Sequence, residues 1–136
     1  MRLFPIAPLV LAFCAPALGQ PAAPLLALPD TPEALADGAA IFERRCSQCH
    51  GLDGVNYKGP WLNGILNRPS AQVPDWAYSD ALRGWGGTWT PANLQAWLTK
   101  PQDFIPGITM NFGGFRARTE DRDKLIAWLI RQPPSP

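Results

Sequence analysis

The residues with the clearest chemistry stand together in the segment Cys46-Ser47-Gln48-Cys49-His50. This is the C-x-x-C-H pattern of a c-type haem attachment site. Two cysteines three residues apart on a helical turn point the same way, so both thiols can add to the vinyl groups of one porphyrin. The imidazole that follows is then placed under the iron. We therefore expect one covalent haem c, attached through Cys46 and Cys49, with His50 as the proximal metal ligand.

Three other interpretations of this segment stay open beside the haem. A structural zinc site usually needs four protein ligands, so Cys46, Cys49 and His50 would need a carboxylate as the fourth. A thioredoxin-like redox pair is expected in a βαβ context, which the sequence does not suggest. A simple disulfide is possible in an oxidising compartment. The histidine directly after the second cysteine favours the haem.

The second axial ligand is expected to be Met110. His50 is the single histidine of the chain, so a pair of histidine ligands is excluded. A lone methionine usually fills a gap in a core, but Met110 follows a loop fixed by Pro106 and Gly107. Ligation by His and Met fills both axial positions and raises the reduction potential. This arrangement favours electron transfer. The alternative is a haem-based small-ligand sensor or a peroxidase-like protein, if Met110 does not bind the iron.

The elements that position these residues are predicted to be short helices. Threonine caps, prolines at first helical positions and apolar residues at helical spacing mark four of them. They are a helix that starts at Pro32 after the cap Thr31 and runs to about Cys46, Ser79–Leu82 closed by Gly84, a helix that starts after Thr90 and ends before Pro101, and a last helix capped by Thr119. Segments 51–74 and 101–118 are predicted loops. Since no strand pattern stands out, the fold class is all-α.

Composition indicates that something large fills the middle of the domain. The chain has 136 residues, enough for one domain, and its six tryptophans are too many for a few short helices to bury. Two long loops in so small a domain also need an internal partner. A large apolar cofactor would satisfy both requirements. The formal net charge of +1 excludes a strongly basic nucleic-acid binder.

The N-terminus has the features of a secretory signal. Arg2 precedes a mostly apolar run, and Ala17-Leu18-Gly19 offers small residues for cleavage. The run is too short to span a bilayer. We expect a cleaved signal peptide over residues 1–19, a Pro/Ala-rich leader over 20–32 and a domain over 33–132. The mature chain would then be periplasmic, with no stable membrane insertion and as many basic as acidic side chains.

Taken together, the motifs make the chain similar to a class I cytochrome c, of the branch close to mitochondrial cytochrome c and its soluble bacterial relatives. The resemblance covers residues 37–131. Gly38 and Phe42 match the N-terminal helix of the family, and the segment around Trp128 matches its C-terminal helix, with Trp in place of the usual Tyr. The resemblance implies that these helices cross at a right angle, which leaves no room for a Cβ at Gly38.

The resemblance also implies roles for residues around the haem. The carbonyl of Pro60 would accept a hydrogen bond from the proximal histidine and orient it. Arg68, Tyr78 and Trp89 match positions that surround the haem propionates, which are costly to bury unless paired. Trp97 stands where the family has a Tyr near the Met sulfur. Phe112 matches the aromatic residue beside the Met ligand at the exposed haem edge.

The fold implied is a small class I cytochrome c fold, three to five short helices around one covalently attached haem. The function implied is one-electron transfer without enzymatic activity, by a monomer that exchanges electrons with redox proteins. The donor and acceptor would come from a cytochrome complex, an oxidase or a dehydrogenase. The lysine ring of the family is largely missing, since only Lys58, Lys100 and Lys124 remain. We therefore expect no strong electrostatic steering to a partner.

Overall fold

The computed structural model describes residues 27–134 and contains five helices. They are α1 (Pro32–Arg45), α2 (Asp80–Trp85), α3 (Pro91–Thr99), α4 (Pro101–Phe104) and α5 (Thr119–Leu129). No strand occurs within these residues; Pro69 and Thr88 form an isolated bridge. The predicted all-α class is confirmed. The expected signal peptide over residues 1–19 lies outside the described part of the chain. Between residues 27 and 134, no helix is long and apolar enough to cross a membrane.

Two helices begin as the sequence predicted. The hydroxyl of Thr31 accepts a hydrogen bond from the backbone N–H of Ala34 at 3.2 Å, and α1 starts with Pro32. The hydroxyl of Thr90 accepts one from the N–H of Asn93, also at 3.2 Å, and α3 follows. In each case the cap satisfies a backbone donor that the helix itself leaves free. Proline at the first helical position has no N–H, so one further backbone donor that would be unpaired is absent.

Three element boundaries differ from the prediction. Gly84 does not end α2. The helix continues to Trp85, and Gly86, the residue that follows it, has a φ of +59°. A left-handed residue after a helix is the conformation that glycine adopts without strain. Thr119 is the first residue of α5, and its helix has no side-chain cap. The predicted loop 101–118 contains the single-turn helix α4, which starts at Pro101.

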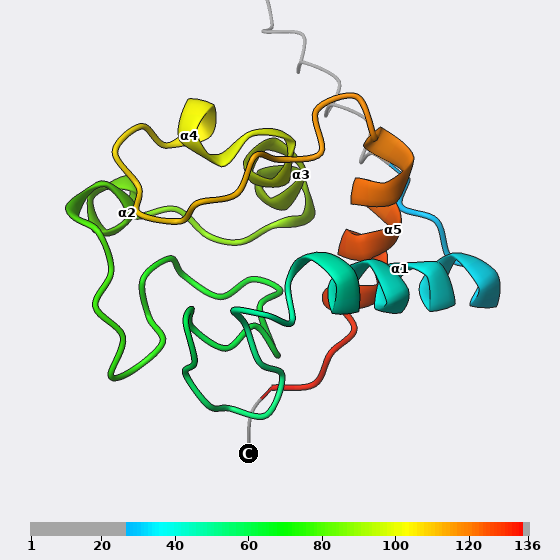
Figure 1. Cartoon of the computed structure of the whole chain (residues 1–136), viewed down its shortest axis with the longest axis horizontal. Helices are drawn as coiled ribbons and strands as arrows, with labels where there is room; N and C mark the ends of the chain where they lie inside the picture. Colours follow the sequence, from blue (N-terminus) through cyan, green and yellow to red (C-terminus); the bar gives the residue numbers. More distant parts are fainter. Residues whose placement is uncertain (1–26, 135–136) are drawn as a thin grey trace, which may run out of the picture.

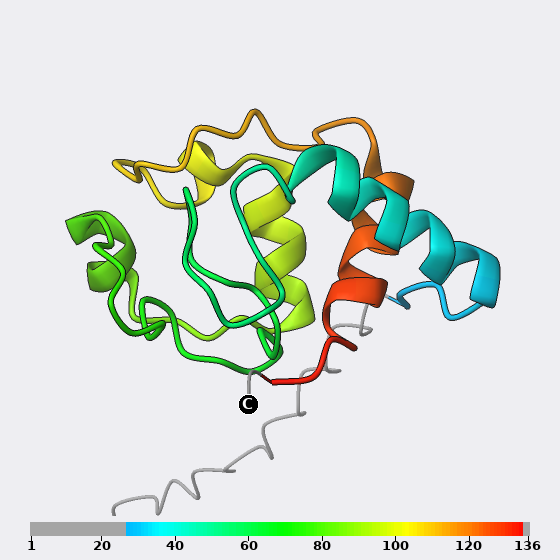
Figure 2. The same cartoon turned by 60° about the horizontal axis from the view of Figure 1, so that its bottom comes forward.

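The helices α1 and α5 cross and pack directly on each other (Figures 1 and 2). A Cβ added to Gly38 would lie 2.7 Å from the Cβ of Trp128 and closer still to the backbone oxygen of Lys124. The rings of Phe42 and Trp128 pack with their centroids 5.2 Å apart. Gly38 thus permits the close approach that the resemblance implied.

The core lies where α5 meets α1 and α3. Its least exposed side chains are Leu125, Ile126 and Ala127 of α5, Phe42 of α1 and Leu94 of α3. Most of the segment between α1 and α2 lies on the side of α3 away from α1, whereas the segment before α5 passes over α3 (Figure 2). Among the helices, α2 has no buried residue and lies at the edge of this arrangement.

We expect Gly38→Ala to lower the free energy of unfolding of the holoprotein by roughly 1–3 kcal/mol, because α1 and α5 must move apart to admit the methyl group. Denaturant unfolding followed by circular dichroism measures the loss.

The matched control is Gly84→Ala, since a Cβ at Gly84 in α2 meets nothing within 4 Å. This change should leave stability unchanged or raise it by up to about 1 kcal/mol, because alanine favours a helix. Equal destabilisation by the two substitutions would contradict the close-approach explanation.

Candidate haem-binding site

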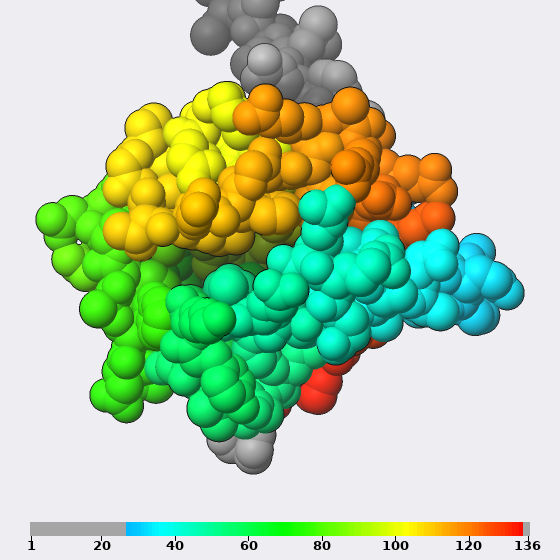
Figure 3. Space-filling view, viewed as in Figure 1, coloured from blue at the N-terminus to red at the C-terminus, as the bar shows by residue number. Residues whose placement is uncertain are grey.

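A cavity of about 400 Å³ opens between α3 and the segments around it. Figure 3 shows the hollow between the segment that follows α4 and the segment that follows α1. Leucine and isoleucine side chains of the core form part of its wall. All ten predicted site residues line it: Cys46, Cys49, His50, Pro60, Arg68, Tyr78, Trp89, Trp97, Met110 and Phe112. A deep, mostly apolar cavity with two thiols and one imidazole on its wall suits a covalently attached haem.

The two cysteines lie on a turn that continues α1. The N–H groups of Cys49 and His50 both donate to the carbonyl of Cys46, at 3.0 and 2.9 Å. Both cysteines are free, with Cys46 half-buried and Cys49 exposed. Burial raises the pKa of the Cys46 thiol to about 12, an effect that the neighbouring Arg45 partly offsets. The turn therefore presents two thiols to the cavity from one helical end.

The ring of His50 is fixed by the backbone of Pro60. Its Nδ1 lies 2.7 Å from the Pro60 carbonyl oxygen, which accepts a hydrogen bond. Burial lowers the pKa of His50, and this hydrogen bond partly opposes the shift. A neutral imidazole that donates from Nδ1 keeps the lone pair of Nε2 free for a metal. The contact that the resemblance implied for Pro60 is present.

Gly59 is a site residue that the sequence reasoning missed. A Cβ at this buried position would lie 2.5 Å from Cε1 of His50, inside van der Waals contact with the ring. The N–H of Gly59 donates to the Cys49 carbonyl at 2.8 Å, and the N–H of Leu62 donates to Gly51 at 2.9 Å. These bonds hold segment 51–62 against the cysteine turn. The available signal was the glycine directly before Pro60.

Arg68 connects the cavity to the loop before it. Its guanidinium donates to the carbonyl oxygens of Asn63 and Trp61, both at 3.1 Å, and lies 4.6 Å from the centre of the Trp61 ring. Burial lowers the pKa of Arg68 and raises that of Tyr78. The Tyr78 hydroxyl accepts a hydrogen bond from the N–H of Val73 at 3.3 Å. Arg68 and Tyr78 therefore place two polar groups on an otherwise apolar wall.

The opposite side of the cavity is built from aromatic rings and the Met110 segment. The ring of Trp89 packs on Trp97 at 5.2 Å and on Trp85 at 4.9 Å. The side-chain amide of Gln102 donates to the backbone carbonyl of Met110 at 2.5 Å, which ties the segment to α4. Trp89 and Trp97 are each 7% exposed, so both indoles are buried within this wall of the cavity.

The zinc interpretation receives no support from the part of the chain that the structure describes. Residues 27–134 contain no group of three or more His, Cys, Asp or Glu side chains able to hold a metal ion. The carboxylate that a zinc site would need beside Cys46, Cys49 and His50 is therefore not supplied by these residues.

Comparisons with known proteins agree with the site. The family model described as "Cytochrome C oxidase, cbb3-type, subunit III" matches residues 33–129. Cytochrome c2 of Agrobacterium tumefaciens is 43% identical over 101 residues, which cover 71% of this chain and 89% of the relative. Cytochrome c of Gibberella zeae is 40% identical over 94 residues, which cover 68% and 88%.

Two further relatives extend the comparison. Cytochrome c-type cyt cy of Rhodobacter capsulatus is 38% identical over 96 residues, which cover 71% of this chain but 48% of that protein, so the chain spans about half of it. The solved structure of cytochrome cH from Methylobacterium extorquens superposes with a TM-score of 0.65 and 34% identity, over 70% of this chain and 95% of that one.

The chain belongs to the cytochrome c family. It has the small all-α fold of a class I cytochrome c, and it carries one c-type haem attached through Cys46 and Cys49. The proteins it resembles are cytochromes c, which are electron carriers.

We expect Arg68→Lys to lower the free energy of unfolding of the holoprotein by about 1–3 kcal/mol, measured by denaturant titration. A lysine ammonium lacks the planar fork that reaches two carbonyl groups at once, so at least one half-buried acceptor loses its partner.

Arg44→Lys is the control, because Arg44 is exposed on the last turn of α1. Its effect should stay within about 0.5 kcal/mol. A loss at Arg68 no larger than at Arg44 would show that the two carbonyl contacts contribute nothing to stability.

Proposed function

We propose that this protein is a one-electron carrier of a respiratory or periplasmic chain, with its haem iron ligated by His50 and Met110. One observation carries the proposal. The single histidine of the chain and the single methionine of residues 27–134 line the same cavity, although they come from segments far apart in the sequence. A carrier needs two fixed protein ligands, and these two residues are available for that purpose.

The protein groups in this proposal hold the ligands rather than react. When bound, the haem supplies an iron that gains and loses one electron. His50 keeps its orientation through the Pro60 carbonyl, and Gly59 leaves room for its ring. Gln102 restrains the backbone of Met110. Because both ligands are held by the fold, the site should change little between oxidation states, and such rigidity favours fast electron exchange.

The wall residues are proposed to set the environment of the haem. Arg68 and Tyr78 supply polar hydrogens toward the propionates, together with the indole N–H of Trp89. Trp97 would lie near the sulfur of Met110, and Phe112 near the exposed edge. With His50 on the iron, the chain has no second imidazole to assist peroxide chemistry, which favours a carrier over a peroxidase-like protein.

The setting of the carrier is also proposed. Residues 1–19 would direct export and be removed, leaving a short leader and the domain over 33–132 in the periplasm. Electron donors and acceptors would be redox proteins that meet the protein at the open side of the haem cavity. A cytochrome complex, an oxidase or a dehydrogenase is the expected partner of the monomer.

Met110→Ala should open the sixth coordination position and lower the reduction potential by on the order of 0.1 V, part of the ~0.8 V range that axial ligands span. Visible spectroscopy of both oxidation states, potentiometry and carbon monoxide binding measure the change. The wild type should keep low-spin bands and should not bind carbon monoxide, whereas Met110→Ala should bind it.

Ile108→Ala is the matched control, because Ile108 lines the same cavity from the same segment and offers no ligand. It should retain the low-spin spectrum. Ready carbon monoxide binding by the wild type would instead favour the small-ligand sensor, and an unchanged spectrum of Met110→Ala would refute this ligand assignment.

A further inference from the structure

Four polar side chains join α3 to α5 outside the haem cavity. They are Gln95 and Thr99 of α3 and Arg122 and Asp123 of α5, and none of them lines that cavity. The guanidinium of Arg122 donates to the Thr99 hydroxyl at 2.6 Å and to the Asp123 carboxylate at 2.9 Å. The same carboxylate oxygen accepts a hydrogen bond from the Gln95 amide at 3.1 Å. We call these four residues the α3–α5 network.

The network is largely buried although it is charged. The Arg122 side chain is 13% exposed, and Gln95 is 5% exposed. The Oε1 atom of Gln95 has no hydrogen-bond partner within residues 27–134. Burial of charges and of unpaired polar atoms costs free energy, and apolar side chains at such a contact are often at least as stabilising. A role in fixing the position of α3 therefore explains the network better than a contribution to stability does.

Thr99 is the last residue of α3, where a helix is least well held. The carbonyl groups at the end of a helix have no partners within it, and the last turn frays readily. Here the Thr99 hydroxyl donates to the carbonyl of Gln95, one turn earlier, at 2.7 Å and accepts the hydrogen bond from Arg122. Arg122 thereby holds the last turn of α3 on α5.

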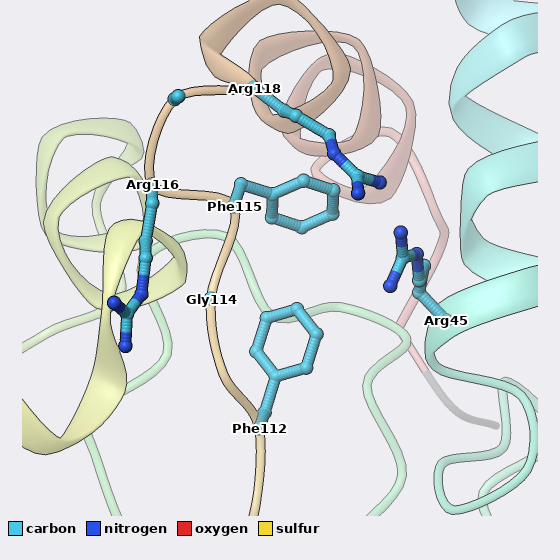
Figure 4. Close-up of a pocket in the computed structure, with 7 residues that line it drawn as sticks. Arg45, Phe112, Gly114, Phe115, Arg116 and Arg118 are labelled. Atoms are coloured by element: carbon cyan, nitrogen blue, oxygen red, sulfur yellow. The ribbon is translucent and has the colours of Figure 1, made fainter.

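This last turn supports one end of residues 110–116, which we call the methionine segment. The N–H groups of Phe115 and Arg116 donate to the carbonyls of the last two residues of α3, at 2.8 and 3.0 Å. Gly114, with φ at +79°, lies so close to the Thr99 backbone that no Cβ fits there. Figure 4 shows this end of the segment, with the Phe115 ring directed to one side and the Arg116 side chain to the other.

The other end of the methionine segment is held by α4. This helix follows α3 after the single residue Lys100, and its first residue, Pro101, is fully buried. The side-chain amide of Gln102 in α4 donates to the carbonyl of Met110 at 2.5 Å. Because α4 starts where α3 ends, both ends of the methionine segment are held from the same point of the fold.

We propose that Arg122 is a positioning residue for the sixth iron ligand: it fixes the last turn of α3 on α5 and so keeps Met110 at the iron. This role rests on the proposed ligation by Met110. Without the guanidinium group, the last turn of α3 loses its side-chain contact with α5, and the backbone bonds to the methionine segment break more often. The sulfur ligand then leaves while α1 and α5 stay packed.

Carbon monoxide binding to the reduced holoprotein tests this role, since the gas reaches the iron only in molecules whose sulfur ligand has left. Arg122→Leu keeps an apolar stem in a helix and removes both hydrogen bonds. It should bind carbon monoxide about tenfold faster than the wild type, the factor expected for loss of one hydrogen bond to a charged group. It should also weaken the far-red band that a methionine ligand gives the oxidised form.

Arg131→Leu is the matched control. Arg131 donates to the carbonyl of Ala127 and to the carboxylate of Asp30, and neither contact involves α3. This substitution also removes two hydrogen bonds, so it should lower the free energy of unfolding, but it should leave the far-red band and the rate of carbon monoxide binding as in the wild type. Denaturant titration of both variants separates loss of overall stability from opening of the methionine segment.

A second pair of variants tests the same contact from α3 and decides the matter if Arg122→Leu does not fold. Thr99→Val has the shape of threonine without the hydroxyl, so it should reproduce the faster binding of carbon monoxide. Thr99→Ser keeps the hydroxyl and should behave as the wild type does. Arg122→Lys keeps a charged donor without the planar fork and should give an intermediate rate.

Hydrogen exchange shows where the structure opens. The amides of Phe115 and Arg116 should exchange about tenfold faster in Arg122→Leu than in the wild type. The amide of Cys46, which donates to the Phe42 carbonyl in α1, should exchange at the wild-type rate. Equally faster exchange at all three amides would indicate a general loss of stability and would overturn the role of Arg122.

Carbon monoxide binding by Arg122→Leu no faster than by Arg131→Leu would overturn that role as well. In both cases the wild type keeps its far-red band, so ligation by Met110 stands. A wild type that lacks the band and binds carbon monoxide readily would instead overturn the ligand assignment, and the role of Arg122 with it. The two failures are therefore distinguished by the wild type alone.

Discussion

The contact between α1 and α5 at Gly38 determines where the chemistry of this protein can occur. Because the two backbones touch there, the direction of α1 is set, and so is the point at which it ends. The cysteine turn continues from that end with no intervening loop, so its position follows from the helix crossing. His50 directly follows Cys49, so the position of its backbone is set in the same way. The Pro60 carbonyl then orients its ring. A rigid packing contact between helices thus places a haem attachment site some distance away.

The second determinant is the use of backbone rather than side chains around His50. Its hydrogen-bond acceptor is a carbonyl, its ring lies against a glycine, and the loop that supplies both is bonded to the cysteine turn through main-chain groups. Main-chain contacts vary little with side-chain identity. The proximal side therefore depends less on side-chain identity than the wall does, where Arg68 makes its contacts through its guanidinium group.

Much of this arrangement could be predicted from the sequence, because short-range signals encode it. The caps at Thr31 and Thr90 depend on neighbouring residues, and the C-x-x-C-H spacing depends on a single turn of helix. Other features depend on contacts between distant segments and left no local signal. Ala71 has a positive φ of 55° although alanine has no intrinsic preference for it. The end of α2 at Gly86 rather than Gly84 also depends on how the following segment packs. A cavity of about 240 Å³ joins Arg45 of α1 to residues 112–118 before α5 (Figure 4), and periodicity cannot reveal such a pairing.

The helix α2, whose side chains are at most partly buried, has a consequence for local opening of the protein. It buries no residue of its own, yet Leu82 within it and Ser79 before it line the haem cavity. A segment without a fully buried residue is expected to open at lower free energy than the core helices. Transient detachment of α2 would admit solvent to the flank of the porphyrin while the helix crossing and the proximal side remain closed. The dielectric constant around the haem would then fluctuate on that flank only.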